Sequence, residues 1–499
     1  MSETTPANRW TTAIEAKSVG FVTADERHGK AWKQGPFWFT CNFNFFSVAL
    51  GFLGPSLGLS LPWTILAGTA GSTFGALFVA LHGTQGPRLG LPQMIQSRAQ
   101  FGCRGVLIPV LVVLFDFMVF NVLQGDVLKS GLHGVFGWNP VAVVIGASAL
   151  AALLAILGHD WLHKTLRIVF WVSIPFYTIL TVAMFTGDAG NSTSPGPALT
   201  GFQLSAFMAV FAAAASYNLS LAPFVSDYTR YLPADTSPWR VVLAIQGGTT
   251  LALAWLMGMG AWLASRTGAS DGLVSLLTSG NLVVGHLGTL LAVLSAVGLI
   301  AVMGVNTYSA VLSLATIIDC FRAMPESRAF RVVATLALMA IWVTVILGLD
   351  SDQSTLIVNL LNIMFYLLVP WTAVNLVDYF LVRRGHYAIG EIIERGGGIY
   401  GQWAWRGLVA YFLGLAAEVP FMVLSFYHGP IAQRLNGIDL SFAVGLIAAG
   451  LVYVLLFRHL QSDGAVETSR HTAEALGDDT PPLAGAPAME SPRDLRRLE

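Results

Sequence analysis

The stretch FAAAASYNLSLAPFVSDYTRYLP, residues 211–233, begins as an apolar helix and then loses that character. Pro223 has no backbone N–H to donate, so it interrupts helical hydrogen bonding. It follows a run of polar side chains, Ser216, Tyr217, Asn218 and Ser220. Unpaired backbone groups are costly in lipid, so an interrupted membrane helix must face protein or a watery cavity. The stretch therefore predicts a broken span inside a helical bundle.

The composition of the whole chain is that of a membrane protein. Of 499 residues, 55% are hydrophobic and only 11% are charged, whereas soluble proteins carry roughly 25% charged residues. Apolar runs of about 20 residues are long enough to cross a bilayer. We therefore expect an all-α polytopic membrane protein surrounded by lipid. The net charge of −1 gives no reason to expect a nucleic-acid partner.

Hydropathy along the chain predicts twelve transmembrane helices. They cover residues 37–60, 63–82, 106–129, 140–158, 167–187, 202–222, 241–263, 284–316, 332–349, 355–381, 407–428 and 440–460. The predicted domains are an N-terminal segment (1–34), a core (35–381), a loop (382–406), two additional helices (407–460) and a tail (461–499). The tail is rich in Pro, Ala, Asp and Glu, which is typical of disorder.

Basic residues predict the orientation of these spans. All but three of the 27 Lys and Arg residues fall on one side if both termini are cytoplasmic. The exceptions are Lys129, Arg266 and Arg434. Cytoplasmic loops of membrane proteins are enriched in basic residues, so we expect both termini in the cytoplasm and the protein in the cell membrane.

A second interruption is expected in the first span, CNFNFFSVALGFLGPSLGL, residues 41–59. Polar side chains there precede residues that weaken helices: Asn42, Asn44 and Ser47, then Gly51, Gly54 and Pro55. The two interruptions lie five spans apart, and an odd repeat length inverts the second copy. Paired interruptions at corresponding positions indicate the midplane site of a transporter. The alternative is that small residues only let helices pack closely.

Three further stretches resemble the nucleobase:cation symporter family, which is purine–cytosine permease-like. They are GPRLGLPQMIQSRAQFG (86–102), LAPFVSDYTRYLP (221–233) and VNLVDYFLVRRGHY (374–387). The resemblance implies a leucine-transporter-like fold with two inverted five-helix repeats, at 35–187 and 202–381, plus two helices. It also implies symport of a nucleobase or related heterocycle with a cation by alternating access, with purine or cytosine favoured.

Span three carries candidate substrate ligands on one helix face. Phe117, Asn121 and Gln124 follow i, i+4, i+7 spacing. An aromatic ring can stack on a flat heterocycle while amides bond along its edge. The family often places Trp before such an amide, so Phe117 is a departure that leaves the substrate's identity open. The alternative for these amides is a contact between helices.

The resemblance adds further substrate-binding candidates. Asn306 in the sequence VNTYS of span eight matches a substrate-binding Asn, with Ser309 one turn later, and Tyr217 and Ser220 match an aromatic and a small polar residue of span six. Beside the first interruption, the candidates are Asn44 and Ser47. The same comparison gives Asp227 and Arg230 a structural contact on the cytoplasmic side.

The coupling cation is expected to be a proton rather than sodium, with no other cofactor and no bound metal. Sodium-coupled members present two Ser or Thr just before the span-eight Asn, where this chain has Gly304 and Val305. Neither side chain can coordinate a cation. Asp116 in span three is the candidate proton carrier because acids inside membranes are costly and often functional. A structural carboxyl is the alternative, and sodium coupling stays possible.

Other functional classes fit the sequence less well. His159 and His163 in HDWLH are spaced to share a metal on a helix, but no third ligand is evident and the segment falls in a predicted loop, so neither a metal site nor an enzyme is expected. A channel would need a repeated filter or a ring of charge, and the sequence offers neither. A carrier of amino acids or of a vitamin-like heterocycle is the nearest alternative. The carrier is expected to act as a monomer.

Overall fold

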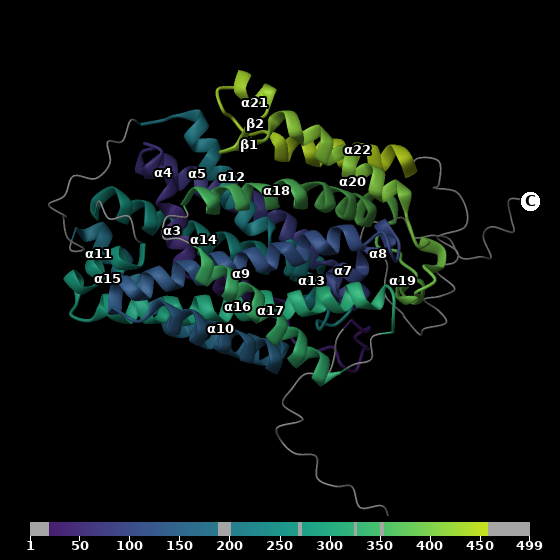
Figure 1. Ribbon diagram of the computed structural model, residues 1–499, viewed down its shortest axis with the longest axis horizontal. Coiled ribbons are helices and arrows are strands. Elements are labelled where there is room, and N and C mark those ends of the chain that lie inside the picture. Colours follow the sequence, from purple (N-terminus) through teal and green to yellow (C-terminus); the bar gives the residue numbers. More distant parts are fainter. Residues whose placement is uncertain (1–18, 188–200, 268–271, 324–326, 350–353, 458–499) are drawn as a thin grey trace, which may run out of the picture.

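The computed structural model describes residues 19–187, 201–267, 272–323, 327–349 and 354–457 (Figure 1). The predicted tail at 461–499 and most of the N-terminal segment lie outside these ranges. Within them, the regular secondary structure is helical apart from one short antiparallel hairpin, which pairs Val423 with His428 and Leu424 with Tyr427, and an isolated bridge between Leu59 and Gly201. The predicted all-helical architecture is therefore confirmed within the described residues.

Within the described residues, nine helical segments are long and apolar enough to cross a membrane, and a bent pair makes a tenth. The bent pair joins residues 31–42 and 45–56 at an angle of 61° and contains η1 (Ala31–Lys33), α2 (Gln34–Asn42), α3 (Phe45–Gly51) and α4 (Leu53–Ser56). The other spans are built on α5 (Leu61–Gly83), α9 (Leu107–Phe136), α10 (Pro140–Leu157), α11 (His159–Thr186), α12 (Leu204–Leu219), α14 (Pro238–Thr267), α16 (Leu287–Asp319), α17 (Arg328–Gly348) and α18 (Ser354–Val377).

Shorter elements connect and flank these spans. The second span continues through α6 (Gln85–Leu89), and the sixth continues through η2 (Ala222–Phe224) and α13 (Val225–Thr229). Between spans lie α7 (Gln93–Gln96), α8 (Arg98–Phe101) and α15 (Gly272–Val283). After α18 come the π-helix η3 (Asp378–Val382), then α19 (Ile389–Ile393), η4 (Gly398–Tyr400), α20 (Trp405–Glu418), η5 (Val419–Phe421), β1 (Val423–Leu424), β2 (Tyr427–His428), α21 (Pro430–Arg434) and α22 (Ser441–Phe457).

Three features differ from the helices expected from sequence. Helix α11 begins at His159, eight residues before the predicted start, so HDWLH is its first turns and not a loop. Helix α20 ends at Glu418 and not near residue 428, because Pro420 cannot continue an α-helix and a 3₁₀ turn takes over. The chain before span eight, expected to be a loop, contains α15, whose Leu273 and Leu276 are buried.

Local sequence explains the junction between α9 and α10. Gly137 ends α9 in the left-handed conformation, with φ of +67°, which glycine adopts without a Cβ penalty. Asn139 then caps α10, and its side chain accepts a hydrogen bond from the Ala142 backbone N–H at 3.1 Å. Pro140 occupies the first turn, where no N–H is needed. The sequence GWNP thus reverses the chain within a few residues.

Enclosure within the bundle separates central helices from peripheral ones. In the most apolar part of each span, 72% of residues are buried for 358–382 and 67% for 204–229 and for α16, but only 28% for α11. Helix α16 packs against both α9 and α10, and α5 packs against α12 and α14. Helices α20 and α22 pack on each other and on α18, along one side of the bundle (Figure 1).

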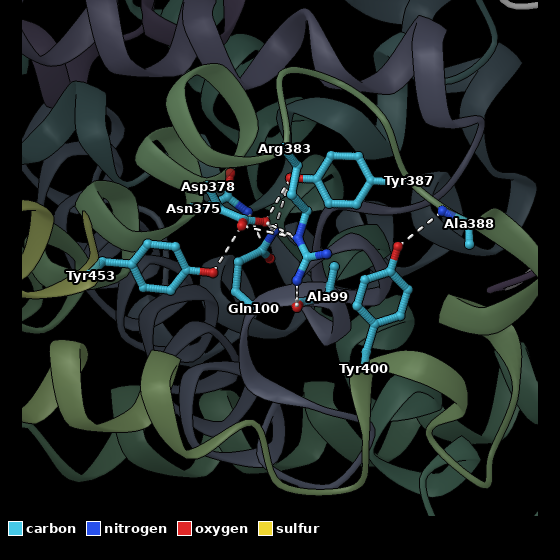
Figure 2. A network of polar contacts seen from close by, with 9 residues as sticks. All are labelled: Ala99, Gln100, Asn375, Asp378, Arg383, Tyr387, Ala388, Tyr400 and Tyr453. Atoms are coloured by element: carbon cyan, nitrogen blue, oxygen red, sulfur yellow. Dashed lines mark hydrogen bonds and ion pairs between the residues drawn. The ribbon is translucent and has the colours of Figure 1, made fainter. Parts of the chain in front are cut away.

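A buried carboxylate ties the additional helices to the rest of the bundle (Figure 2). Asp378, at the end of the tenth span, accepts hydrogen bonds from Gln100 Nε2 at 2.6 Å, Tyr387 Oη at 2.7 Å and Tyr453 Oη at 2.9 Å. The Arg383 guanidinium pairs with it at 3.0 Å. Since Gln100 follows α5 and Tyr453 belongs to α22, one fully buried acid fixes three separate parts of the chain.

Candidate functional site

The first span is interrupted at Phe43 and Asn44, several residues before Gly51, Gly54 and Pro55. Helix α2 ends at Asn42, and Asn44 adopts an extended conformation in which its Oδ1 accepts from the Phe46 N–H at 3.1 Å. Ser47 Oγ donates to the Asn42 carbonyl at 2.6 Å. Asn44 and Ser47, predicted as substrate ligands, therefore pair backbone groups that the interruption frees, and both are fully buried.

Close packing accounts for both Gly51 and Gly54, since a Cβ added to Gly54 would lie 2.2 Å from Thr64 Oγ1. A Cβ added to Gly51 would lie 2.2 Å from the Met257 carbonyl oxygen, and one added to Gly260 would lie 2.0 Å from the Val48 carbonyl oxygen. Helices α3 and α14 thus cross with their backbones in contact. At Gly51 and Gly54 the packing explanation weighed in the sequence applies.

The sixth span changes helix type over a few residues. Helix α12 ends at Leu219, η2 carries Pro223, and α13 resumes the helix at Val225. The segment 204–229 still passes as a single span, so it bends less than the first. Ser220 Oγ donates to the Tyr217 carbonyl at 2.8 Å, which makes Ser220 a local cap here.

The two interrupted spans are joined through their amides. Asn42 Nδ2 donates to Asn218 Oδ1 at 2.5 Å and to the Thr249 carbonyl at 3.1 Å. Asn218 Nδ2 donates in turn to the Ser72 carbonyl at 2.8 Å and to its hydroxyl at 2.9 Å. This cluster fixes α2 and α12 to each other and to α5 and α14.

Three predicted amides meet between α9 and α16. Asn306 Nδ2 lies 3.3 Å from Asn121 Oδ1 and 3.2 Å from Gln124 Oε1. Asn121 Nδ2 donates to Thr307 Oγ1 at 3.0 Å. The structure therefore brings Asn121, Gln124 and Asn306 together and adds Thr307, which neither the spacing nor the resemblance indicated.

Aromatic rings border the amides. Tyr217 stacks on Phe46, with ring centroids 5.5 Å apart, and tilts against Phe120 at 5.8 Å. Its hydroxyl lies 3.4 Å from Asn44 Nδ2. Phe117 meets Phe224 of η2 edge-on at 5.2 Å. Of these rings, Phe46, Phe120 and Phe224 were not predicted, although Phe120 directly precedes Asn121.

The cluster is enclosed on all sides. Phe117, Asn121 and Gln124 are each 1% exposed, Tyr217 is 2% exposed and Asn306 is 4% exposed. Four elements, α3, α9, α12 and α16, supply rings and amides to one buried region. Such a set can hold a flat polar ring by stacking and by hydrogen bonds along its edge, but only if parts of the bundle move to admit it.

The intramembrane acids have different surroundings. Asp116 is buried, and within the described ranges neither of its carboxylate oxygens has a hydrogen-bond partner, so it is not bonded to the amides. Asp126 pairs with Lys129 at 2.6 Å. Glu418 is buried in α20, away from the amides, and pairs with none of the described groups either.

Gly304, one of the two positions compared with the sodium-coupled members, does not face the first interruption. A Cβ on Gly304 would meet Leu154 and Ala151 of α10, whereas a Cβ on Gly298 would lie 3.4 Å from the Phe43 carbonyl oxygen. Gly298 therefore faces the interruption. From Ala296 to Val305, α16 carries no side-chain oxygen.

The predicted contact between Asp227 and Arg230 takes a specific form. Arg230 Nε donates to the Asp227 backbone carbonyl at 3.3 Å, and the Asp227 carboxylate accepts from the Gln93 N–H at 3.0 Å. Both side chains are buried. The pair thus links the end of the sixth span to the segment after α5, away from the amide cluster.

Broken and continuous apolar helices around a buried polar and aromatic cluster define a membrane transport protein. Over residues 21–445, the chain matches the family described as permease for cytosine/purines, uracil, thiamine, allantoin. It is 32% identical over 453 residues to a putative purine-cytosine permease of Bacillus subtilis, covering 89% of this chain and 96% of that relative. It is 25% identical over 466 residues to a purine-cytosine permease of Emericella nidulans, covering 89% and 88%. The chain belongs to this permease family, whose members are transporters and not enzymes.

Solved structures agree with this fold. Mhp1, a nucleobase-cation-symport-1 family transporter in a closed conformation with bromovinylhydantoin bound, superposes with a TM-score of 0.70 at 18% identity, covering 91% of this chain and 99% of that one. The inward-facing conformation of Mhp1 gives a TM-score of 0.66 at 18% identity, covering 92% and 99%. At this identity, the likeness shows a common fold.

Proposed function

We propose that this permease is a secondary active symporter that imports a nucleobase or a closely related planar heterocycle, with purine or cytosine favoured. A proton accompanies the substrate in preference to sodium. The protein works by alternating access as a monomer in the cytoplasmic membrane, with both termini inside. The orientation rests on the distribution of Lys and Arg.

The order of elements supports twelve spans with an inverted repeat of five. An interrupted span (α2–α3), a long helix (α5), short helices (α6 to α8) and three long helices (α9, α10 and α11) come first. The order recurs as an interrupted span (α12–α13), then α14, the short α15, and α16, α17 and α18. Helices α20 and α22 are the two additional spans. In such repeats, the interrupted helices flank the substrate.

The observation that carries the substrate assignment is the meeting of three amides beside aromatic rings. Asn121, Gln124 and Asn306 together offer amide donors and acceptors, and within the described residues no charged side chain takes part in the hydrogen bonds that join them. A nucleobase presents the same mixture of donors and acceptors on a neutral, flat ring. The permeases named above as relatives point to the same chemical class.

Two features support a proton as the coupling ion. Sodium prefers hard oxygen ligands, and α16 supplies no side-chain oxygen from Ala296 to Val305. The hydroxyl of Ser295, one turn before Gly298, is already bonded to the Tyr177 hydroxyl. Asp116 is a buried acid with no hydrogen-bond partner in the part of the chain that the structure describes. A carboxyl in that setting is far easier to bury when it carries a proton, so its loading can accompany the transport cycle.

The experiment is uptake into proteoliposomes that contain the purified protein. Radiolabelled cytosine, adenine or hypoxanthine is supplied under an imposed pH gradient or an imposed sodium gradient, with amino acids, allantoin and thiamine as competitors. We expect accumulation driven by the pH gradient, collapsed by a protonophore and competed by purines. Accumulation driven only by sodium would refute the proton assignment. Competition only by amino acids would refute the substrate class.

A further inference from the structure

Two histidines and one aspartate from distant parts of the chain converge at the start of α11. His28 precedes η1, while His159 and Asp160 open α11. Asp160 Oδ1 lies 2.9 Å from His159 Nδ1 and 3.7 Å from His28 Nε2. One ligand atom from each residue can be chosen so that all three lie within 4.8 Å of one another. His28 therefore supplies the third potential ligand that the sequence of HDWLH lacked.

His28 is already oriented as a metal ligand. Its Nδ1 lies 2.8 Å from the Glu26 carbonyl, which can only accept, so in the neutral ring Nδ1 carries the proton and Nε2 presents its lone pair. A carbonyl on the second ring nitrogen is a common way to fix metal-binding histidines. The His28 backbone N–H donates to the Tyr231 carbonyl at 2.5 Å, which anchors the residue.

The site combines a fixed ligand with accessible ones. The His159 side chain is 10% exposed, and its ring lies 4.3 Å from that of Tyr231. The side chains of His28 and Asp160 are 59% and 81% exposed, so an ion can reach them from water. His163, the partner expected from i, i+4 spacing, instead stacks on Phe37 at 4.0 Å.

The ligand set and its spacing suit a zinc-like ion. Tetrahedral zinc at about 2.0–2.1 Å from nitrogen and oxygen ligands places neighbouring ligand atoms about 3.3 Å apart. The separations of 2.9 Å and 3.7 Å lie on either side of that value, so small side-chain movements would close the site. The ion would replace the proton on His159 Nδ1, and water would fill the fourth position.

We propose that His28, His159 and Asp160 form a binding site for a divalent transition-metal ion of the zinc class, and that the bound ion restrains the transporter. Helix α2 follows His28 by a few residues and packs against α11. An ion shared by His28 and α11 would therefore fasten the segment that leads into the interrupted first span. This second part rests on the proposed alternating access, in which that face must open to release substrate.

Direct metal binding tests the site without any transport assay. The purified full-length protein is titrated with Zn²⁺ against a chromophoric chelator, alongside His28→Ala and Asp160→Asn, with His428→Ala as a control at an exposed histidine on β2. We expect one tight equivalent in the parent and in His428→Ala, and affinity at least tenfold weaker in the two site variants. Equal affinity in all four proteins would overturn the site.

Uptake into proteoliposomes tests the restraint. With Zn²⁺ on both sides of the membrane, we expect uptake by the parent to slow several-fold and uptake by His28→Ala to stay unchanged, while the two proteins match without the ion. Zinc that binds at this site and leaves parental uptake unaltered would overturn the restraint. If the parent accumulates no heterocycle under any gradient, the proposed function fails, whereas the binding titration still decides the metal site.

Discussion

Asn42 Nδ2 donates to Asn218 Oδ1 at 2.5 Å, and this bond connects the two interrupted spans. Both side chains are fully buried. Asn42 is the last residue of α2, and Asn218 is the next-to-last residue of α12. The pair therefore sets the relative position of the two helix ends next to which the rings of Tyr217 and Phe46 stack.

Replacing Asn218 by alanine should destabilise the protein. The change leaves a donor of Asn42 and the Ser72 carbonyl without their partner, and an unsatisfied buried polar group costs about 1–3 kcal/mol. Thermal unfolding in detergent should show a lower midpoint. The control is Thr278→Ala, because the exposed Thr278 hydroxyl bonds only within its own helix. Equal midpoints for Asn218→Ala and the parent would contradict the role given to this pair.

Asp116→Asn should separate substrate binding from proton coupling. The amide keeps the size of the side chain but cannot exchange a proton, so uptake should lose its response to an imposed pH gradient while heterocycle binding persists. Asp126→Asn is the comparison, since Asp126 pairs with Lys129 near the membrane edge. If Asp116→Asn still accumulated substrate under a pH gradient alone, the proton carrier would lie elsewhere.

The contact between α3 and α14 predicts a position-specific effect of adding one methyl group. Gly260→Ala would drive a Cβ to 2.0 Å from the Val48 carbonyl oxygen, so α14 must shift and the midpoint of unfolding should fall. Gly247→Ala in the same helix meets nothing within 4 Å and should be neutral or slightly stabilising, since alanine favours helix by about 1 kcal/mol. Similar midpoints for the two variants would contradict this packing.

Removing the buried carboxylate of Asp378 should destabilise the protein far more than removing the exposed charge of Arg384, the residue after its partner Arg383. Removing one member of a buried ion pair costs about 3–5 kcal/mol, so Asp378→Asn should unfold at a markedly lower temperature. Tyr453→Phe removes one hydrogen bond to Asp378 and should cost only about 1 kcal/mol. Arg384→Gln, at an exposed neighbouring position, should match the parent. An unchanged midpoint in Asp378→Asn would mean that this network does not hold α22 to the bundle.

The sequence predicted those features that depend on local pattern. Apolar runs located the membrane helices, and the spacing of Asn121 and Gln124 placed them on the face that meets Asn306. The end of α20 was placed about ten residues too late, because the chain after Glu418 stays apolar. There a 3₁₀ turn that contains Pro420, followed by a two-residue strand, replaces the expected helix.

Contacts between distant residues were beyond the sequence. Nothing local to Asn42 indicates Asn218, 176 positions away, as its partner. His28 likewise gives no sign that it meets His159. The bend at Phe43 has no glycine or proline of its own, because the capping bond of Asn44 with Phe46 creates it. Such features depend on which helices pack together, and the local pattern of residues does not reveal these neighbours.

The most direct measurement is equilibrium binding of a nucleobase to the purified protein, in the parent, Asn306→Ala and Asn359→Ala. Asn359 is an amide that bonds Ser425 away from the cluster, so its variant controls for the loss of any amide. We predict that the parent and Asn359→Ala bind a purine or cytosine alike and that Asn306→Ala binds at least tenfold more weakly, which corresponds to about 1.4 kcal/mol. Undiminished binding by a folded Asn306→Ala protein would contradict a substrate site between α9 and α16.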